Sequence, residues 1–195
     1  MNNLINQFFS IFLIIIIFLC FAISSIAITD TELNNNILHS SEFVWPISGY
    51  THISSYYGKR KSPTAGASSF HSGIDIPAPE GTPIKSICSG IVTFCSWGAG
   101  GGYTIVIEND IYKVSYCHVS PIFIIKKGDV INIGQIISSV GPKNVYGIRN
   151  NPYKDSNGNP TNGATTGCHL HLSIRKDRQT YRSSFLLWFK LNLSN

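Results

Sequence analysis

Short apolar runs broken by Gly, Pro and Asn make up most of the chain from residue 43 onward. Runs of this length that are rich in β-branched and aromatic residues predict strands, and the residues between them predict turns. Only segment 183–191 has a pattern compatible with a short helix, or else with a last strand, and we expect it to pack on the core. The expected strands span residues 52–58, 83–88, 90–97, 103–110, 111–119, 129–140 and 168–175. The pattern therefore predicts a β-rich domain with many turns.

The chain is long enough, at 195 residues, for one domain with a hydrophobic core. Two stretches, 80–92 and 127–140, are weakly similar, because each begins with a charged residue and Gly and has a second Gly before Ile. This similarity suggests two related β-units that fold against each other. The glycine-rich stretch 97–103 lies between two expected strands with no helix after it, which favours a flexible turn over a phosphate-binding loop.

The first 27 residues carry no charged side chain, and an apolar run over residues 8–21 precedes small residues that end at Ala27. This order is typical of a secretory signal peptide that is cleaved after Ala27. The alternative is an uncleaved membrane anchor over residues 8–28, because that stretch approaches the length of a membrane span. Both interpretations predict an exported domain, which would be located either in the periplasm or in the cell wall or extracellular space. A polar, Asn-rich linker is expected at 28–43.

The formal net charge of the chain is +5 at pH 7 with neutral histidines. For an exported protein, nucleic acid is not an expected partner. Anionic wall polymers and membrane surfaces are better candidates for a basic domain.

Two of the six histidines, His169 and His171, stand one residue apart in the strand expected at 168–175. Side chains at positions i and i+2 of a strand point to the same face, so the two imidazoles share their surroundings. Two surface histidines on a solvated sheet would give the same pattern. The loop at 142–167 has no apolar period and leads directly into His169, which predicts that it forms one wall of a cleft.

A second pair, His71 and Asp75, stands four residues apart in a stretch where Gly73 and Pro77 favour extended chain. A hydrogen-bonded pair that stabilises a loop is the structural alternative. Two imidazoles and one carboxylate from separate strands form a three-ligand zinc set that leaves the fourth position for water, as catalytic sites do. Such a metal lowers the pKa of bound water and polarises a carbonyl group, which indicates hydrolysis. Spacing alone leaves open which histidine of the H-x-H pair would bind the metal.

Four segments resemble the lysostaphin-type (LytM-domain) zinc metalloendopeptidases, whose patterns are H-x-x-x-D, Y-x-H and H-x-H. The segments are HSGIDIPAPEGTPI, YCHVS, KKGDVINIGQIISSVG and TTGCHLHLSIR, and they occur in the order of that family. The resemblance covers about residues 44–190, which we expect to form the metallopeptidase domain, followed by a tail at 191–195. It implies a mostly antiparallel all-β fold of the duplicated hybrid motif. It also implies a cleft for the stem peptides or cross-bridges of bacterial peptidoglycan.

The resemblance also implies roles for five side chains of this chain. His71, Asp75 and His171 would bind Zn²⁺. His118 and His169 would lie beside the metal-bound water, where they orient it and stabilise the oxyanion. The loop before the H-x-H pair is longer than in many relatives, so substrate preference does not transfer.

Two other functions compete with a zinc peptidase. A non-catalytic relative that binds the wall or activates another hydrolase would lose metal ligands, whereas this chain keeps all of them. A sugar phosphocarrier module has a similar fold and uses histidines for phosphate, but the export signal and the carboxylate ligand argue against it.

Four cysteines follow residue 27: Cys88, Cys95, Cys117 and Cys168. Cys117 precedes His118 and Cys168 precedes His169, so strand alternation predicts both thiols behind the two histidines. A disulfide between Cys117 and Cys168 would brace the histidines, with Cys88 and Cys95 as a competing pair. Two buried free thiols are the alternative, and we favour them slightly.

Overall fold

The computed structural model of the protein describes residues 43–64, 66–176 and 179–180. These residues belong to one compact unit that begins at Phe43. The expected signal peptide, nearly all of the expected linker, the segment 183–191 and the tail at 191–195 lie outside the described residues. In the described part of the chain, no helix is long and apolar enough to cross a membrane.

Strands make up nearly all of the regular structure, and every described strand pair is antiparallel. A single 3-10 turn, η1 (Ala99–Gly101), is the helical element among the described residues. The mostly antiparallel all-β fold predicted from the sequence is therefore confirmed. The strands are β1 (Gly58–Lys59), β2 (Phe70–His71), β3 (Ile74–Pro77), β4 (Pro83–Lys85), β5 (Gly90–Trp97), β6 (Tyr103–Glu108), β7 (Tyr112–Cys117), β8 (Val130–Ile131), β9 (Ile136–Ser139), β10 (His169–Lys176) and β11 (Gln179–Thr180).

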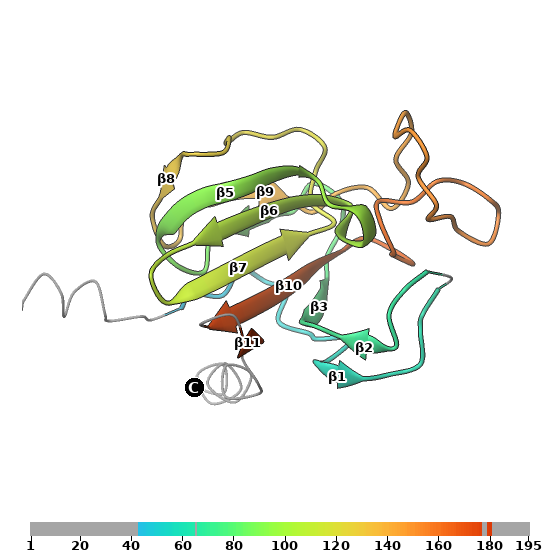
Figure 1. The fold of residues 1–195 in the computed structure, drawn as a ribbon, viewed down its shortest axis with the longest axis horizontal. Coiled ribbons are helices and arrows are strands. Elements are labelled where there is room, and N and C mark those ends of the chain that lie inside the picture. The colour runs from blue at the N-terminus through green and yellow to red at the C-terminus, as the bar shows by residue number, and fades with distance from the viewer. Residues whose placement is uncertain (1–42, 65, 177–178, 181–195) are drawn as a thin grey trace, which may run out of the picture. The chain divides into compact units, whose positions relative to one another are not determined.

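A seven-stranded sheet in the order β11–β10–β7–β6–β5–β8 forms the main layer, and β3 also pairs with β10 (Figure 1). β1–β2 and β4–β9 form two separate two-stranded sheets. The two weakly similar stretches of the sequence pair with each other, because β4 pairs with β9 and β5 pairs with β8. The expectation of two β-units that fold against each other agrees with this pairing.

The hydrophobic core lies on one face of the main sheet and follows from strand alternation. In β10, Leu170, Leu172 and Ile174 are buried in the core cluster, while His169 and His171 alternate with them and point to the other face. Complete burial of each such apolar side chain stabilises the fold by roughly 1.5–3 kcal/mol. The fully buried Tyr116 of β7 belongs to this core, and its hydroxyl accepts a hydrogen bond from Ile87 N at 2.8 Å. The histidines therefore lie on the face of the main sheet that is opposite the hydrophobic core.

Two expected strands differ from the structure. The stretch expected at 129–140 is divided into β8 and β9 by a turn in which Gly134 has φ +77° and Asn132 N donates to the Gln135 side chain. The stretch expected at 52–58 is mostly irregular and reaches β1 only at its last residue. It contributes one isolated bridge, between Ser55 and Asp75. The glycine-rich stretch forms a turn between β5 and β6, as expected.

Candidate metal centre and groove

β10 brings the candidate site together because other strands pair with both of its edges. On one edge His171 lies directly opposite Asp75 of β3, and on the other it lies opposite Cys117 of β7. His71, at the end of β2, reaches the same place because the chain crosses close to β10 at Gly73. A Cβ atom at Gly73 would lie 2.2 Å from the Leu172 carbonyl oxygen, so only glycine allows this approach.

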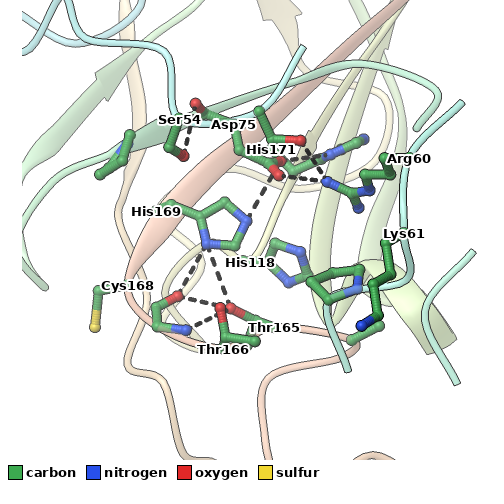
Figure 2. A pocket seen from close by; sticks show the side chains of 15 residues that line it. Ser54, Arg60, Lys61, Asp75, His118, Thr165, Thr166, Cys168, His169 and His171 are labelled. Carbon is green, nitrogen blue, oxygen red and sulfur yellow. Dashed lines mark hydrogen bonds and ion pairs between the residues drawn. The ribbon is translucent and has the colours of Figure 1, made fainter. Parts of the chain in front are cut away.

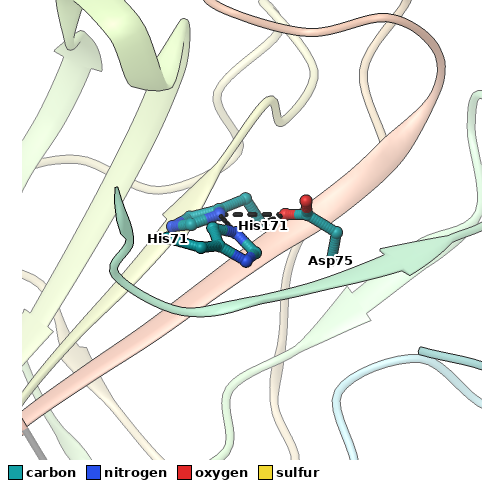
Figure 3. Close-up of side chains that lie close together, drawn as sticks. All are labelled: His71, Asp75 and His171. Atoms are coloured by element: carbon teal, nitrogen blue, oxygen red, sulfur yellow. Dashed lines mark hydrogen bonds and ion pairs between the residues drawn. The ribbon is translucent and has the colours of Figure 1, made fainter. Parts of the chain in front are cut away.

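His71, Asp75 and His171 form a tight cluster in which three ligand atoms face one another (Figure 3). Asp75 Oδ1 lies 3.0 Å from His71 Nε2 and 2.9 Å from His171 Nδ1. The two imidazole nitrogens are 2.8 Å apart. The structure therefore brings together the two nitrogens and one oxygen that the sequence singled out.

The donor set of this cluster fits a divalent cation. His71 Nδ1 lies 2.9 Å from the Tyr56 carbonyl oxygen, which can only accept, so Nδ1 carries the ring proton. The lone pair of neutral His71 is then on Nε2, which faces the acceptor Asp75 Oδ1. While both imidazoles are neutral, the three facing atoms share at most one proton, on His171 Nδ1. A cation in place of that proton would face three acceptors. Metal sites use this arrangement, with a histidine that is anchored by a backbone carbonyl.

The ionisation states agree with that arrangement. Burial on its own would raise the pKa of Asp75, but the neighbouring imidazoles of His169, His171 and His71 hold it well below its usual range. Burial lowers the pKa of His171, although the Asp75 carboxylate opposes this shift. A carboxylate and a neutral imidazole are the forms that bind metal.

Arg60 holds the outer oxygen of Asp75, a contact that sequence reasoning missed. Its Nη1 donates to Asp75 Oδ2 at 3.1 Å and to Ser55 Oγ at 2.6 Å. Ser55 Oγ in turn lies 3.1 Å from His71 Nδ1, so Arg60 is linked to two residues of the cluster. In sequence, Arg60 stands within Lys-Arg-Lys, a pattern typical of solvated charge. The pairing of β1 with β2 and the bridge of Ser55 to Asp75 bring it to the site.

His118 is buried at the end of β7 with φ +59°, a left-handed conformation that is uncommon for residues other than glycine. Its Nδ1 donates to the Asn162 carbonyl oxygen at 2.6 Å, which leaves Nε2 for other partners. Burial lowers the pKa of His118 to about 3, and the neighbouring histidines contribute. The fully buried Asn162 was not singled out from the sequence, where it lies in a turn-like stretch with Pro160 and Gly163.

His169 completes the cluster from the start of β10 (Figure 2). Its Nδ1 donates to the Gly167 carbonyl oxygen at 2.9 Å, and its Nε2 lies 3.4 Å from Asp75 Oδ1. The ring centroids of His118 and His169 are 4.7 Å apart. The five side chains predicted to act together therefore lie in one place.

Two pockets meet at this cluster. The Asp75 pocket, of about 460 Å³, contains Asp75, His169 and Lys61, and residues 164–167 line it. The Arg175 pocket, of about 350 Å³, continues over the polar face of the sheet as far as Arg175. The two pockets share Arg60, His118, Ala164 and His171, so together they form a groove across the cluster. The loop at 142–167 was predicted to form one wall of a cleft, and its last four residues, 164–167, do line the groove.

The four cysteines after residue 27 are free thiols, which agrees with the slightly favoured alternative, and Cys117 and Cys168 form no disulfide. Alternation breaks at the left-handed His118, and Cys117 shares its face with His171 rather than lying behind the histidines. Burial raises the pKa of the Cys117 thiol to about 11. Cys168 packs against the core cluster and points away from His169 (Figure 2).

The model of peptidase family M23 matches residues 69–183, which include all five side chains of the cluster. The chain belongs to this family. This confirms the resemblance to lysostaphin-type peptidases and disfavours the phosphocarrier alternative.

Several characterised proteins are similar to the chain. It is 31% identical over 131 residues to the DD-carboxypeptidase/endopeptidase Mpg of Neisseria meningitidis serogroup B, a match that covers 67% of this chain and 26% of the relative. It is 32% identical over 123 residues to the L-Ala–D-Glu endopeptidase of Bacillus subtilis, which covers 62% of this chain and 34% of that protein. The chain thus spans about a quarter to a third of the length of these relatives.

Solved structures show the same fold. A zinc-containing peptidase from Vibrio cholerae superposes with a TM-score of 0.55 at 27% identity, over 72% of this chain and 38% of that one. The catalytic domain of lysostaphin from Staphylococcus simulans superposes with a TM-score of 0.53 at 27% identity, over 72% of this chain and 92% of that domain.

Proposed function

We propose that this chain is an exported zinc metalloendopeptidase that hydrolyses peptide bonds in the stems or cross-bridges of bacterial peptidoglycan. The observation that carries the proposal is the triangle of His71 Nε2, Asp75 Oδ1 and His171 Nδ1, with sides of 2.8–3.0 Å, inside a groove. When bound, zinc would lower the pKa of a water molecule and polarise the carbonyl of the bond to be cut.

His71, Asp75 and His171 would hold the metal in this proposal. Arg60 keeps Asp75 Oδ2 occupied, so only Oδ1 is directed at the two imidazoles. A carboxylate that offers one oxygen leaves more room at a metal than one that offers two. The protein would in this way keep a position open for water and substrate.

His118 and His169 would carry protons in the reaction. Each imidazole is anchored through Nδ1 to a backbone carbonyl, of Asn162 and Gly167 respectively, so its Nε2 is the atom that can exchange a proton. Nε2 of one histidine can accept a proton from the attacking water and return it to the leaving amine. A protonated Nε2 can instead donate to the oxyanion of the tetrahedral intermediate. Both assignments rest on the family resemblance and on the proximity of the two rings.

The proposed substrate and location follow from the relatives. The names of these relatives describe a DD-endopeptidase and an L-Ala–D-Glu endopeptidase, which are activities on peptides of the bacterial wall. A wall substrate requires export, which agrees with the signal peptide expected over the first 27 residues or the anchor expected over residues 8–28. The basic net charge of +5 suits a partner in the anionic wall.

A non-catalytic wall-binding protein or hydrolase activator is the alternative. The retention of both nitrogens, the carboxylate and both neighbouring histidines favours the enzyme, because a binding module has no need of them. Metal content separates the two: we expect about one zinc per purified chain.

Digestion of purified walls tests whether the protein is a peptidase and which peptide bond it cuts. Peptidoglycans of different cross-bridge chemistry are incubated with the zinc-loaded protein, and the fragments are identified by mass spectrometry. Release of peptides with new amino termini would support the proposal and name the bond. Binding to the walls without any cleavage, by protein that contains zinc, would favour the alternative.

Replacement of Arg60 by Ala is expected to lower zinc affinity by about 10- to 100-fold, because the group that orients a ligand carboxylate is lost. Competition with a chromophoric chelator measures this affinity directly, without any substrate. Lys61→Ala is the matched control, since Lys61 lines the same pocket and has no described contact with His71 or Asp75. Equal zinc affinities of Arg60→Ala and the unmodified protein would show that Arg60 does not position the carboxylate.

A further inference from the structure

The Arg175 pocket has a floor of small polar side chains. Every second residue of β10 shares one face, and on this face lie His171, Ser173 and Arg175. Their partners on β7 are, in the same order, Cys117, Ser115 and Lys113. Thr104 of β6 continues the same row opposite Cys117. Small side chains at the centre of the row leave room above the sheet between the histidine cluster and Arg175.

Arg175 closes this pocket with a positive charge that has no carboxylate partner among the described residues. Its side chain is exposed, and no carboxylate in the described part of the chain lies within 4.0 Å of it. Glu108, which lines a neighbouring pocket with Arg175, is already paired with Lys113 at 2.6 Å and bonded to Thr93. Asp110 of that neighbouring pocket is likewise no partner at this distance. None of the described carboxylates therefore occupies the guanidinium group.

Positive charge predominates in the lining of the groove. Arg60 and Arg175 line the Arg175 pocket, and among its described lining residues there is no Asp or Glu. The Asp75 pocket adds Lys61, and its one described carboxylate is Asp75, which is engaged by three histidines and Arg60. A groove of this kind attracts anionic groups and repels cationic ones.

We propose that the Arg175 pocket binds a carboxylate of the peptide substrate, so that the enzyme selects peptides that carry an acidic group to one side of the cleaved bond. Guanidinium and carboxylate groups match in shape and form paired, charge-assisted hydrogen bonds. The proposal rests on the proposed peptidase function and adds to it the chemical class of the preferred substrate.

The distance along β10 limits where this carboxylate can lie. Arg175 is four positions after His171, so their Cα atoms are about 13 Å apart at a rise of about 3.3 Å per residue of strand. An extended peptide bound along the pocket has nearly the same rise, so its acidic group would lie within about four residues of the bond at the histidine cluster. A carboxylate at that distance makes no contact with the reacting atoms and acts on selectivity alone.

Paired peptide substrates test this proposal with the zinc-loaded full chain. The two members of each pair differ only in one group, a side-chain carboxylate or the corresponding carboxamide, placed at each position within four residues of the cleaved bond. We expect the carboxylate to raise kcat/KM about three- to tenfold at one position. Arg175→Gln should abolish that preference and leave hydrolysis of the carboxamide peptide within about twofold. Arg175→Lys should retain part of the preference, since it keeps the charge without the planar fork.

Two control variants locate the effect. Lys176→Gln changes the next residue, whose side chain alternates to the other face, and Lys61→Gln removes a charge from the other pocket. Both should keep the preference of the unmodified protein. The proposal is overturned if the preference persists in Arg175→Gln, or if Lys61→Gln abolishes it instead. Equal hydrolysis of both members at every position would also overturn it, while failure to cleave any peptide would count against the peptidase function itself.

Discussion

The Asp75→Ala variant is expected to lose zinc and peptidase activity together. Asp75 Oδ1 is the atom that touches both His71 Nε2 and His171 Nδ1, so its removal leaves two imidazoles without the anionic member of the set. A two-histidine site binds zinc far more weakly than three ligands that include a carboxylate. Metal analysis after dialysis should fall from about one zinc per chain to near zero, and digestion of walls should stop.

Thermal unfolding separates loss of the metal from loss of the fold. A ligand that binds only the native state raises the unfolding temperature, so added zinc should stabilise the unmodified protein and leave Asp75→Ala unchanged. Glu80→Ala, at an exposed acidic residue outside the groove, is the matched control and should behave like the unmodified protein. An Asp75→Ala protein that keeps a full equivalent of zinc and still cuts peptidoglycan would show that the ligand assignment is incorrect.

The central strands could be predicted closely from the sequence because each has one buried face. The run expected at 90–97 has the same bounds as β5, and the run expected at 168–175 differs from β10 by one residue at each end. In β10 alternation reports burial directly, whereas β5 has a register shift between Val92 and Phe94 and leaves Ile91 and Phe94 exposed. The prediction of one continuous strand at 129–140 was wrong, because the apolar residues of this run are not all buried. Val130 is 74% exposed and Ile136 is 50% exposed. Apolar content alone could not reveal the turn between β8 and β9.

The histidines and Asp75 could be found from the sequence because their spacing carries the signal, whereas the residues that hold them could not. Ser55 and Arg60 contact residues that are 16 and 15 positions away in the sequence. Asn162 is 44 residues away from His118 and contacts it through its backbone carbonyl. Every residue has such a carbonyl, so the sequence gives no sign of which one accepts the hydrogen bond. The left-handed conformation of His118 could not be predicted from the sequence either. It explains why the alternation argument failed for Cys117, whereas the argument held for Cys168.

His118→Ala and His169→Ala are expected to keep zinc and to lower kcat by about 100-fold or more. Each histidine is held through Nδ1 by a backbone carbonyl, which leaves Nε2 beside the metal cluster for proton transfer or oxyanion stabilisation, the roles that the family resemblance implies. Because His118 has φ +59°, a second variant, His118→Asn, separates loss of the imidazole from backbone strain, since Asn adopts this conformation more readily than Ala.

Metal content measured beside turnover decides between the roles of the two histidines in the H-x-H pair. His171→Ala should lose zinc and activity together, whereas His169→Ala should lose activity alone. His52→Ala, at an exposed histidine outside the groove, should change neither quantity. Loss of zinc from His169→Ala with zinc retained in His171→Ala would reverse the two roles. In that case Asp75 Oδ1, which lies 3.4 Å from His169 Nε2, would share the metal with His169 instead of His171.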